Sequence, residues 1–298
     1  MVNSYFKDLP ILDRQSKPRE TGINYVRAPV MAGSVVEDYL AAFGEMVDIF
    51  KLSGKQAMMM SDDSLKAFIS ACKNHQVMVA VGNPVMDVAL TGGRETVEGM
   101  LASIKKLGID IVELSSVARA IDDQDVCRII ESANKKGIRV INEVGVAFAH
   151  SRVGRDEMFV ENVKKQTQRF LEAGSWKILL ESEGLSENMG GEPIQWPVID
   201  SIISHMDLKD FMVEADDQDI LSKYIESYGP NINMMVDHSR VLKMEDARIG
   251  FGPSQFLWGK VVKYSSGPLS LKNKATLEVL TGSTISMVYR TGSALLQA

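Results

Sequence analysis

The sequence contains only two cysteines in 298 residues, Cys72 and Cys127. Both lie among apolar residues in segments with helical periodicity, so we expect two reduced, buried thiols. A small secreted domain held together by disulfides needs more cysteines than this. The chain also has no CxxC pair, no HExxH, no Walker-type loop and no GxGxxG. Zinc chemistry and nucleotide binding therefore have no local support in the sequence.

Long apolar runs are absent as well. No run approaches the roughly 20 residues that a membrane-spanning helix needs, and residues 1–20 lack the apolar core of a secretory signal. A formal net charge of −6 does not favour nucleic acid or an anionic membrane as a partner. An apolar content of 45% and a charged content of 24% are those of a soluble globular protein. We predict a cytoplasmic protein that binds neither nucleic acids nor membranes.

Four short apolar runs, each ending in a glutamate, are the most informative feature of the chain. An uninterrupted apolar run of this length is typical of a parallel strand that is covered on both faces. Because the carboxyl ends of the strands meet at one end of a parallel barrel, the four carboxylates are expected to form a ring there. The runs are Asp110–Ser115, Ile138–Gly145, Lys177–Ser182 and Phe211–Ala215, and their glutamates are Glu113, Glu143, Glu181 and Glu214.

Eight strand–helix units follow one another at spacings of about 25 to 35 residues, as expected for βα units. They predict an α/β protein with a single (β/α)8 TIM barrel over residues 21–263. Residues 1–20 are expected to form an N-terminal arm, and residues 264–298 a C-terminal tail whose structure the sequence does not indicate. The expected strands are Ile23–Val26, Met46–Lys51, Val77–Val81, Asp110–Glu113, Ile138–Glu143, Trp176–Glu181, Phe211–Glu214 and Ile232–Val236.

Two helices carry more specific expectations. Gly33-Ser34 is expected to supply the N-cap of a helix over Val35–Phe43. The long helical stretch Pro84–Leu107 is expected to break at Thr91-Gly92-Gly93 into two helices.

Crowded carboxylates repel one another unless a divalent cation, a basic partner or a shared proton compensates their charge. Oxygen ligands without nearby cysteine, in a chain with four histidines, point to Mg²⁺ rather than zinc. The ring therefore predicts a magnesium site. Taken singly, each glutamate could simply be a polar residue at the point where a strand meets solvent. The predicted metal ligands are Glu113, Glu143, Glu181 and Glu214.

Basic residues also follow the expected strands. Arg27 and Lys51 end adjacent strands, so they could neutralise the carboxylates or hold an anionic substrate. The segment Val146–Asp156 is longer than an ordinary βα loop and contains His150, Arg152 and Arg155. It could be a solvated surface loop, or a lid that closes positive charge over a phosphate or carboxylate.

The order and spacing of these motifs resemble the phosphosulfolactate synthase family over residues 22 to 260. The resemblance implies a (β/α)8 barrel, often oligomeric, that uses Mg²⁺ to add sulfite to phosphoenolpyruvate in an early step of coenzyme M synthesis. It also implies a homo-oligomer. The matching stretches are Asp38-Tyr39-Leu40, Val47–Gly54, Ile111–Ser115, Ile141–Gly145, Leu180-Glu181, Val213-Glu214-Ala215 and Asn233.

The chain departs from the family pattern at several positions, and some of these positions carry positive charge in the family. Arg27-Ala28 stands in place of Asp-Lys, and Ser182–Leu185 in place of Gly-Arg-Glu-Ser. Ser116-Val117 replaces an acid-glycine pair, and Val146 replaces a basic residue. In this divergence the chain is also similar to the heat-stress-associated proteins of plants. The candidate replacements for the lost cations are Arg27, Arg119, Arg152, Arg155 and His238.

The leading hypothesis is a Mg²⁺-dependent lyase of the phosphosulfolactate synthase type. Lys51 is expected to move a proton at the carbon beside the substrate carboxylate, with a pKa lowered toward neutrality by burial and neighbouring positive charge. Two alternatives remain: a non-catalytic, stress-associated barrel acting through protein contacts, and an aldolase with Lys51 as Schiff base. The predicted catalytic residues are Lys51, Glu143 and His238, and the predicted substrate-binding residues are Arg27, Asn83, Ser115, Arg152 and Arg155.

Overall fold

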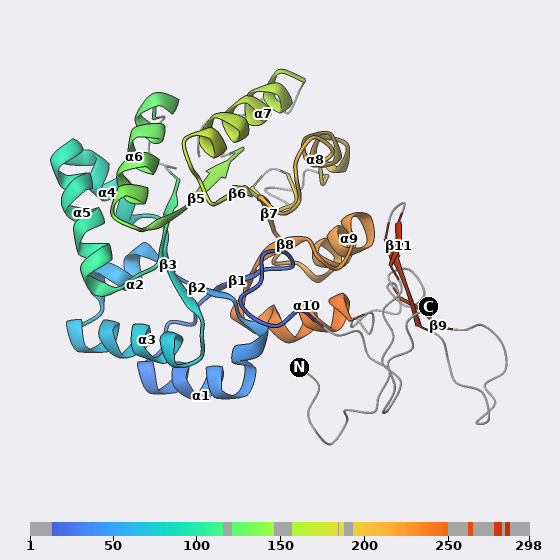
Figure 1. Ribbon diagram of the computed structural model, residues 1–298, viewed down its shortest axis with the longest axis horizontal. Helices are drawn as coiled ribbons and strands as arrows, with labels where there is room; N and C mark the ends of the chain where they lie inside the picture. Colours follow the sequence, from blue (N-terminus) through green and yellow to red (C-terminus); the bar gives the residue numbers. More distant parts are fainter. Residues whose placement is uncertain are drawn as a thin grey trace.

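The computed structural model describes residues 14–115, 121–145, 157–183, 185–187 and 193–249, and the backbone of three short segments nearer the C-terminus. Eight parallel strands close into a barrel in chain order, with β1 paired to β8. Helices surround the strands as an outer ring (Figure 1). The predicted (β/α)8 TIM barrel is confirmed.

The barrel strands are short and almost entirely buried, which explains their uninterrupted apolar sequences. They are β1 (Asn24–Arg27), β2 (Ile49–Leu52), β3 (Met78–Val81), β4 (Ile111–Leu114), β5 (Arg139–Val144), β6 (Lys177–Leu180), β7 (Phe211–Glu214) and β8 (Asn233–Asp237).

Most of the helices bury one apolar stripe against the barrel, as an amphipathic helix does. They are α1 (Gly33–Phe43), α2 (Gly54–Met59), α3 (Asp62–Asn74), α4 (Val85–Thr91), α5 (Arg94–Leu107), α6 (Asp123–Lys135), α7 (Glu157–Glu172), α8 (Trp196–Ile203), α9 (Gln218–Tyr228) and α10 (Val241–Arg248). Two 3₁₀ turns, η2 (Gly44–Met46) and η3 (His238–Arg240), precede β2 and α10.

Two local expectations were wrong and one is confirmed. The N-cap of α1 is Ala32 without a side-chain hydrogen bond, and Gly33 is already helical. A Cβ on Gly33 would lie 2.8 Å from the Ala67 side chain, so close packing of α1 on α3 explains the glycine. Met46 belongs to η2 rather than to a strand. The break at Thr91-Gly92-Gly93 is confirmed, because α5 starts only after Gly93, which has a φ of +76°.

Alternation along the strands divides the core into two parts, because successive side chains point to opposite faces of a strand. The outer part packs between strands and helices. The inner part fills the barrel with Ile23, Tyr25, Ile49, Ala80, Ile111, Ile141, Leu179, Met212 and Met235. A side chain two positions after an inner residue also points into the barrel. Each strand-end glutamate stands two positions after an inner residue, so all four side chains point inward at the C-terminal mouth. These glutamates are Glu113, Glu143, Glu181 and Glu214.

Residues before β1 close the opposite end. Arg19 forms a buried ion pair with Asp48 at 2.8 Å, and Arg14 pairs with Glu245 of α10 at 2.9 Å. In the C-terminal part, β9 (Val262–Tyr264), β10 (Leu277–Thr281) and β11 (Thr284–Ser286) form an antiparallel sheet in the order β11-β10-β9.

Both cysteines are free thiols, as predicted, but only Cys72 is buried. Cys127 of α6 is partly exposed, packs at the edge of the core, and has its Sγ 4.0 Å from the carbonyl oxygen of Arg169 in α7. Within the described part of the chain, no helix combines the length and the apolar character needed to cross a membrane.

Candidate active site

Three carboxylates on consecutive strands meet at the C-terminal mouth of the barrel. Glu143 comes from β5, Glu181 directly follows β6, and Glu214 ends β7. One oxygen of each lies within 4.8 Å of an oxygen of the other two. Glu181 and Glu214 are only 9% and 8% exposed. A group of three acidic oxygens at this separation can hold a hard divalent cation.

The pKa values of Glu143 and Glu214 show that the carboxylate group lacks compensating positive charge. Burial raises the pKa of Glu143 well above its usual value, and the neighbouring Glu181 and Glu113 add to the shift despite Lys51. Burial and Glu181 likewise raise the pKa of Glu214 to about 7, although Arg27 and Lys51 oppose this. The carboxylates therefore cannot all be ionised at low cost unless a cation joins them.

Lys51 and Glu113 form an ion pair beside this group. The Lys51 Nζ lies 2.6 Å from the Glu113 Oε1, and the hydroxyl of Tyr25 donates to the Glu113 Oε2 at 2.8 Å. Glu113 is not part of the three-carboxylate group among the described residues. Both carboxylate oxygens of Glu113 already have a partner, so Glu113 is the counter-ion of Lys51.

The expected lowering of the Lys51 pKa was wrong. Burial alone would lower it, but the carboxylates of Glu113, Glu143 and Glu214 outweigh burial and raise the pKa of Lys51. The neighbour that sets the charge of Lys51 is thus an acid and not the positive charge of Arg27. Lys51 is an ammonium group in this site.

Gly82, on the loop after β3, makes room for the ion pair. A Cβ at this position would lie 2.5 Å from the Lys51 Cε and 2.9 Å from the Glu113 Oε1. The next residue, Asn83, donates from its Nδ2 to the Ser115 Oγ at 2.8 Å. Ser115 in turn favours the ionised form of Glu143, because it lowers the pKa of that carboxyl. Asn83 and Ser115 therefore connect the β3 and β4 loops to the carboxylate group.

The Asn83 side chain has a second polar atom, Oδ1. Its Oδ1 is buried and has no hydrogen-bond partner within the described residues. Buried polar atoms normally have a partner. Together with its donor bond to Ser115, this leaves Asn83 placed to accept a hydrogen bond at the C-terminal mouth.

Arg27 lies in register with Lys51 of β2 and Asp237 of β8, but its guanidinium pairs with Glu214 and Asp216. It neutralises two acids in this arrangement, and a substrate anion would have to compete with them.

The ring of His238 lies against Tyr39 of α1, with 6.3 Å between ring centroids, and not in the carboxylate group. Arg152, Arg155 and His150 lie outside the described residues, as does Arg119.

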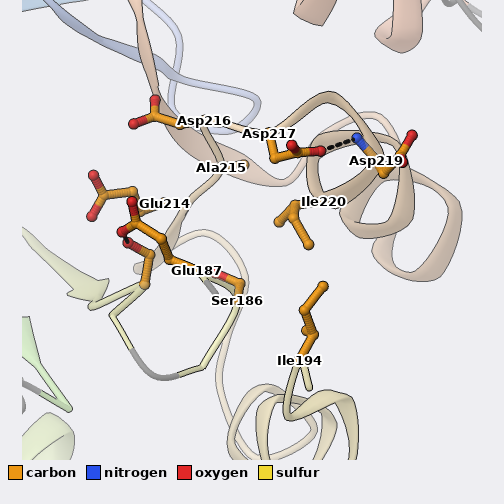
Figure 2. A pocket seen from close by; sticks show the side chains of 10 residues that line it. Ser186, Glu187, Ile194, Glu214, Ala215, Asp216, Asp217, Asp219 and Ile220 are labelled. Carbon is orange, nitrogen blue, oxygen red and sulfur yellow. Dashed lines mark hydrogen bonds between the residues drawn. The ribbon is translucent and has the colours of Figure 1, made fainter. Parts of the chain in front are cut away.

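A cavity of about 490 Å³ opens beside Glu214 and continues along the start of α9 (Figure 2). Its charged lining residues in the described structure are all acidic. Asp217 caps α9 by accepting from the Asp219 amide at 2.8 Å. This cavity was not predicted from the sequence, although the run Ala215-Asp216-Asp217 after β7 carries its signal. The charged lining residues are Glu187, Glu214, Asp216, Asp217 and Asp219.

Sequence reasoning also missed Tyr25 and Gly82. Tyr25 reads as an ordinary strand aromatic, and its contact with Glu113 spans 88 residues of sequence. Gly82 reads as a strand-terminating glycine, and only the position of Lys51 shows why no side chain fits there.

Comparisons with known proteins agree on the family. The family model of (2R)-phospho-3-sulfolactate synthase (ComA) matches residues 12–252. The Arabidopsis thaliana protein HEAT-STRESS-ASSOCIATED 32 is 25% identical over 256 residues, covering 79% of this chain and 88% of that protein. Phosphosulfolactate synthase of Methanothermobacter thermautotrophicus is 23% identical over 226 residues, covering 74% of this chain and 85% of the enzyme.

Solved structures add a likeness of fold alone. The crystal structure of 3-hexulose-6-phosphate synthase superposes with a TM-score of 0.50 at 12% identity, covering 76% of this chain and 98% of that one. The family match extends over the whole barrel, from β1 to α10. The chain belongs to the (2R)-phospho-3-sulfolactate synthase family.

Proposed function

We propose that the protein is a Mg²⁺-dependent lyase that adds sulfite, or a similar nucleophile, to phosphoenolpyruvate or a related small anionic enol substrate. The observation that carries the proposal is the convergence of Glu143, Glu181 and Glu214 at the C-terminal mouth, where TIM-barrel enzymes keep their chemistry. Family membership supports the reaction type.

The donor set fits magnesium. All three groups offer hard oxygen atoms, with neither thiolate nor imidazole in the group. The raised pKa values of Glu143 and Glu214 are the mark of carboxylates short of positive charge. Glu143, Glu181 and Glu214 would hold the ion, with Glu113 kept as the partner of Lys51. A bound Mg²⁺ supplies stabilisation of negative charge that develops on the substrate carboxylate.

The residues of the chain would then act as follows. Sulfite forms a bond from its sulfur to C3 of phosphoenolpyruvate, and the electrons of the C2–C3 double bond move toward the carboxylate. Lys51, an ammonium group at the same mouth, donates a proton to C2 and regains one from solvent. Glu113 and Tyr25 hold Lys51 in position. Asn83, through its open Oδ1, and Ser115 orient the substrate.

The ammonium state of Lys51 counts against the aldolase alternative, because a Schiff base begins with attack by a neutral amine. The non-catalytic alternative has one specific support. Arg27, which stands where the family pattern has Asp-Lys, is tied to Glu214 and Asp216, and the cavity beside it is acidic. A homo-oligomer and a cytoplasmic location stay predictions.

Product formation distinguishes the proposed lyase from the non-catalytic barrel. Phosphoenolpyruvate and sulfite are incubated with the purified protein, with Mg²⁺ or with EDTA, and the phosphorus signals are followed by NMR. A lyase converts phosphoenolpyruvate to a new phosphate ester only with Mg²⁺, and Lys51→Met removes the conversion. If wild-type protein with Mg²⁺ leaves both reactants unchanged while Mg²⁺ still binds, the non-catalytic barrel is the better account.

A further inference from the structure

A second cavity, of about 470 Å³, lies at the N-terminal mouth of the barrel, opposite the carboxylates. The first residues of β3, β5 and β6, which are Met78, Arg139 and Lys177, form one side. The segment from Lys17 to Glu20, ahead of β1, forms another. The volume falls within the range of about 300–1,000 Å³ found for small-molecule sites. The inner residues Ile111, Ile141 and Leu179 separate this cavity from the C-terminal mouth.

The cavity is positive in a chain whose net charge is −6. Five basic and three acidic residues line it. Two of the basic residues have acidic partners: Arg19 pairs with Asp48 at 2.8 Å and Lys209 with Asp207 at 3.1 Å. The other three have no carboxylate within 4.0 Å in the described parts of the chain. They are Lys17, Arg139 and Lys177.

These three cations line one cavity without a direct ion pair among the described residues, although the acids Glu20, Asp48 and Asp210 lie on the same lining. Lys177 is only 4% exposed, and its ammonium group donates to the carbonyls of Glu20, at 3.2 Å, and Lys209. Lys17 donates to the carbonyls of His75 and Gln76 at 3.3 and 3.4 Å. Burial lowers the pKa of both lysines, although nearby carboxylates, Asp48 for Lys17 and Asp210 for Lys177, oppose the shift. A buried charge is costly unless an opposite charge compensates it.

Trp176 fixes the two strand cations at the wall of the cavity. The guanidinium of Arg139 lies 4.7 Å from the centroid of the indole ring, and the Lys177 Nζ lies 5.2 Å from it. Cation–π contact holds both groups in place while leaving N–H donors for other partners. The arrangement is a preformed set of donors around a cavity, with an aromatic surface beside them.

We propose that this cavity binds a small metabolite through an oxyanion, phosphate or carboxylate, held by Lys17, Arg139 and Lys177. The ligand would supply the missing negative charge and would join the segment before β1 to the barrel strands. Because catalytic groups of TIM barrels lie at the other mouth, the site would act on stability or regulation and not on the reacting atoms. It does not depend on the proposed lyase activity.

Calorimetric titration at constant ionic strength tests the proposal, with inorganic phosphate and succinate as separate probes and with chloride as the reference anion. Arg139→Gln is the main variant because Arg139 is exposed, so its loss leaves folding intact. Lys177→Met is the second variant. Lys66→Gln, at an exposed lysine of α3 that does not line the cavity, is the matched control. Arg27→Ala and Glu143→Gln report on the catalytic mouth.

We expect phosphate, succinate or both to bind wild-type protein. The dissociation constant should rise about tenfold or more in Arg139→Gln and in Lys177→Met, the loss expected for one hydrogen bond to a charged group. Lys66→Gln, Arg27→Ala and Glu143→Gln should bind as wild type does. Which probe binds identifies the oxyanion. The proposal is overturned if neither probe binds, if Arg139→Gln binds with unchanged affinity, or if only Arg27→Ala or Glu143→Gln weakens binding.

Discussion

Lys51 and Glu113, which are 62 residues apart in the chain, form an ion pair of 2.6 Å at the C-terminal mouth of the barrel. The Glu113 side chain is 1% exposed and that of Lys51 14% exposed. The pair sits directly beside the carboxylate group of Glu143, Glu181 and Glu214. It therefore links the stability of the fold to the protonation state of the proposed proton donor.

Removing only one charge of the Lys51–Glu113 ion pair should destabilise the fold. Lys51→Met leaves Glu113 buried without its counter-ion, and breaking a buried ion pair in this way costs about 3–5 kcal/mol. The double variant Lys51→Met/Glu113→Gln removes both charges and should recover most of that loss. Urea denaturation of both variants measures the free energy of unfolding. Equal stability of Lys51→Met and wild type would show that the pair contributes little.

Gly82→Ala should disturb the site more than the fold. The added Cβ would displace the end of the Lys51 side chain, from which it would be only 2.5 Å away. A flexible lysine can move, so we expect a loss of stability of at most about 1 kcal/mol, at the low end for overpacking. Proton transfer by Lys51 should nevertheless fall sharply, as seen in kcat. Gly99→Ala, a helical position in α5 with nothing near its Cβ, is the control and should keep full activity.

The protein without metal should become less stable as the pH rises from about 5.5 to 8. The pKa values of Glu143 and Glu214 are raised in the folded state, that of Glu214 to about 7. In this window the folded state binds more protons than the unfolded state, so the free energy of unfolding falls with rising pH. Urea midpoints in EDTA at both pH values measure the effect, and Glu214→Gln should reduce it. A wild-type midpoint that rises with pH would contradict the assigned shifts.

Arg27→Gln should raise the pKa of Glu214 further. Arg27 pairs with that carboxylate and opposes the shift caused by burial, so its removal favours the protonated form. NMR titration of labelled glutamate measures the change, with Asp216→Asn as the comparison because it removes the other partner of Arg27. If Arg27→Gln instead leaves the Glu214 titration unchanged and raises only KM, Arg27 acts on the substrate and not on the carboxylate.

The barrel could be predicted because local pattern and global fold agree along most of the chain. Glu113 and Glu214, for example, each follow an apolar inner residue by two, and that spacing alone places them at one mouth. The partners within the mouth could not be predicted. The register between neighbouring strands decides whether Lys51 pairs with Glu113 or with another acid. In this register Lys51 of β2 lies opposite Ala80 of β3.

The basic cavity at the opposite mouth was also beyond sequence reasoning. Arg139 and Lys177 begin their strands like ordinary solvent-facing cations, and Lys17 belongs to a segment with no strand or helix pattern. Only the closure of the barrel brings all three around one space.

Magnesium titration by calorimetry at pH 8 shows whether Glu143, Glu181 and Glu214 form a metal site. We predict that wild-type protein binds Mg²⁺, and that Glu181→Gln and Glu214→Gln each weaken binding at least about tenfold, since even partners outside the ligand shell cost 10–100-fold. An exposed acid outside the group, Glu172→Gln on α7, should leave the affinity unchanged. Absence of binding to wild-type protein, or equal affinity in wild type, Glu181→Gln and Glu214→Gln, would rule out a Mg²⁺ site at these carboxylates.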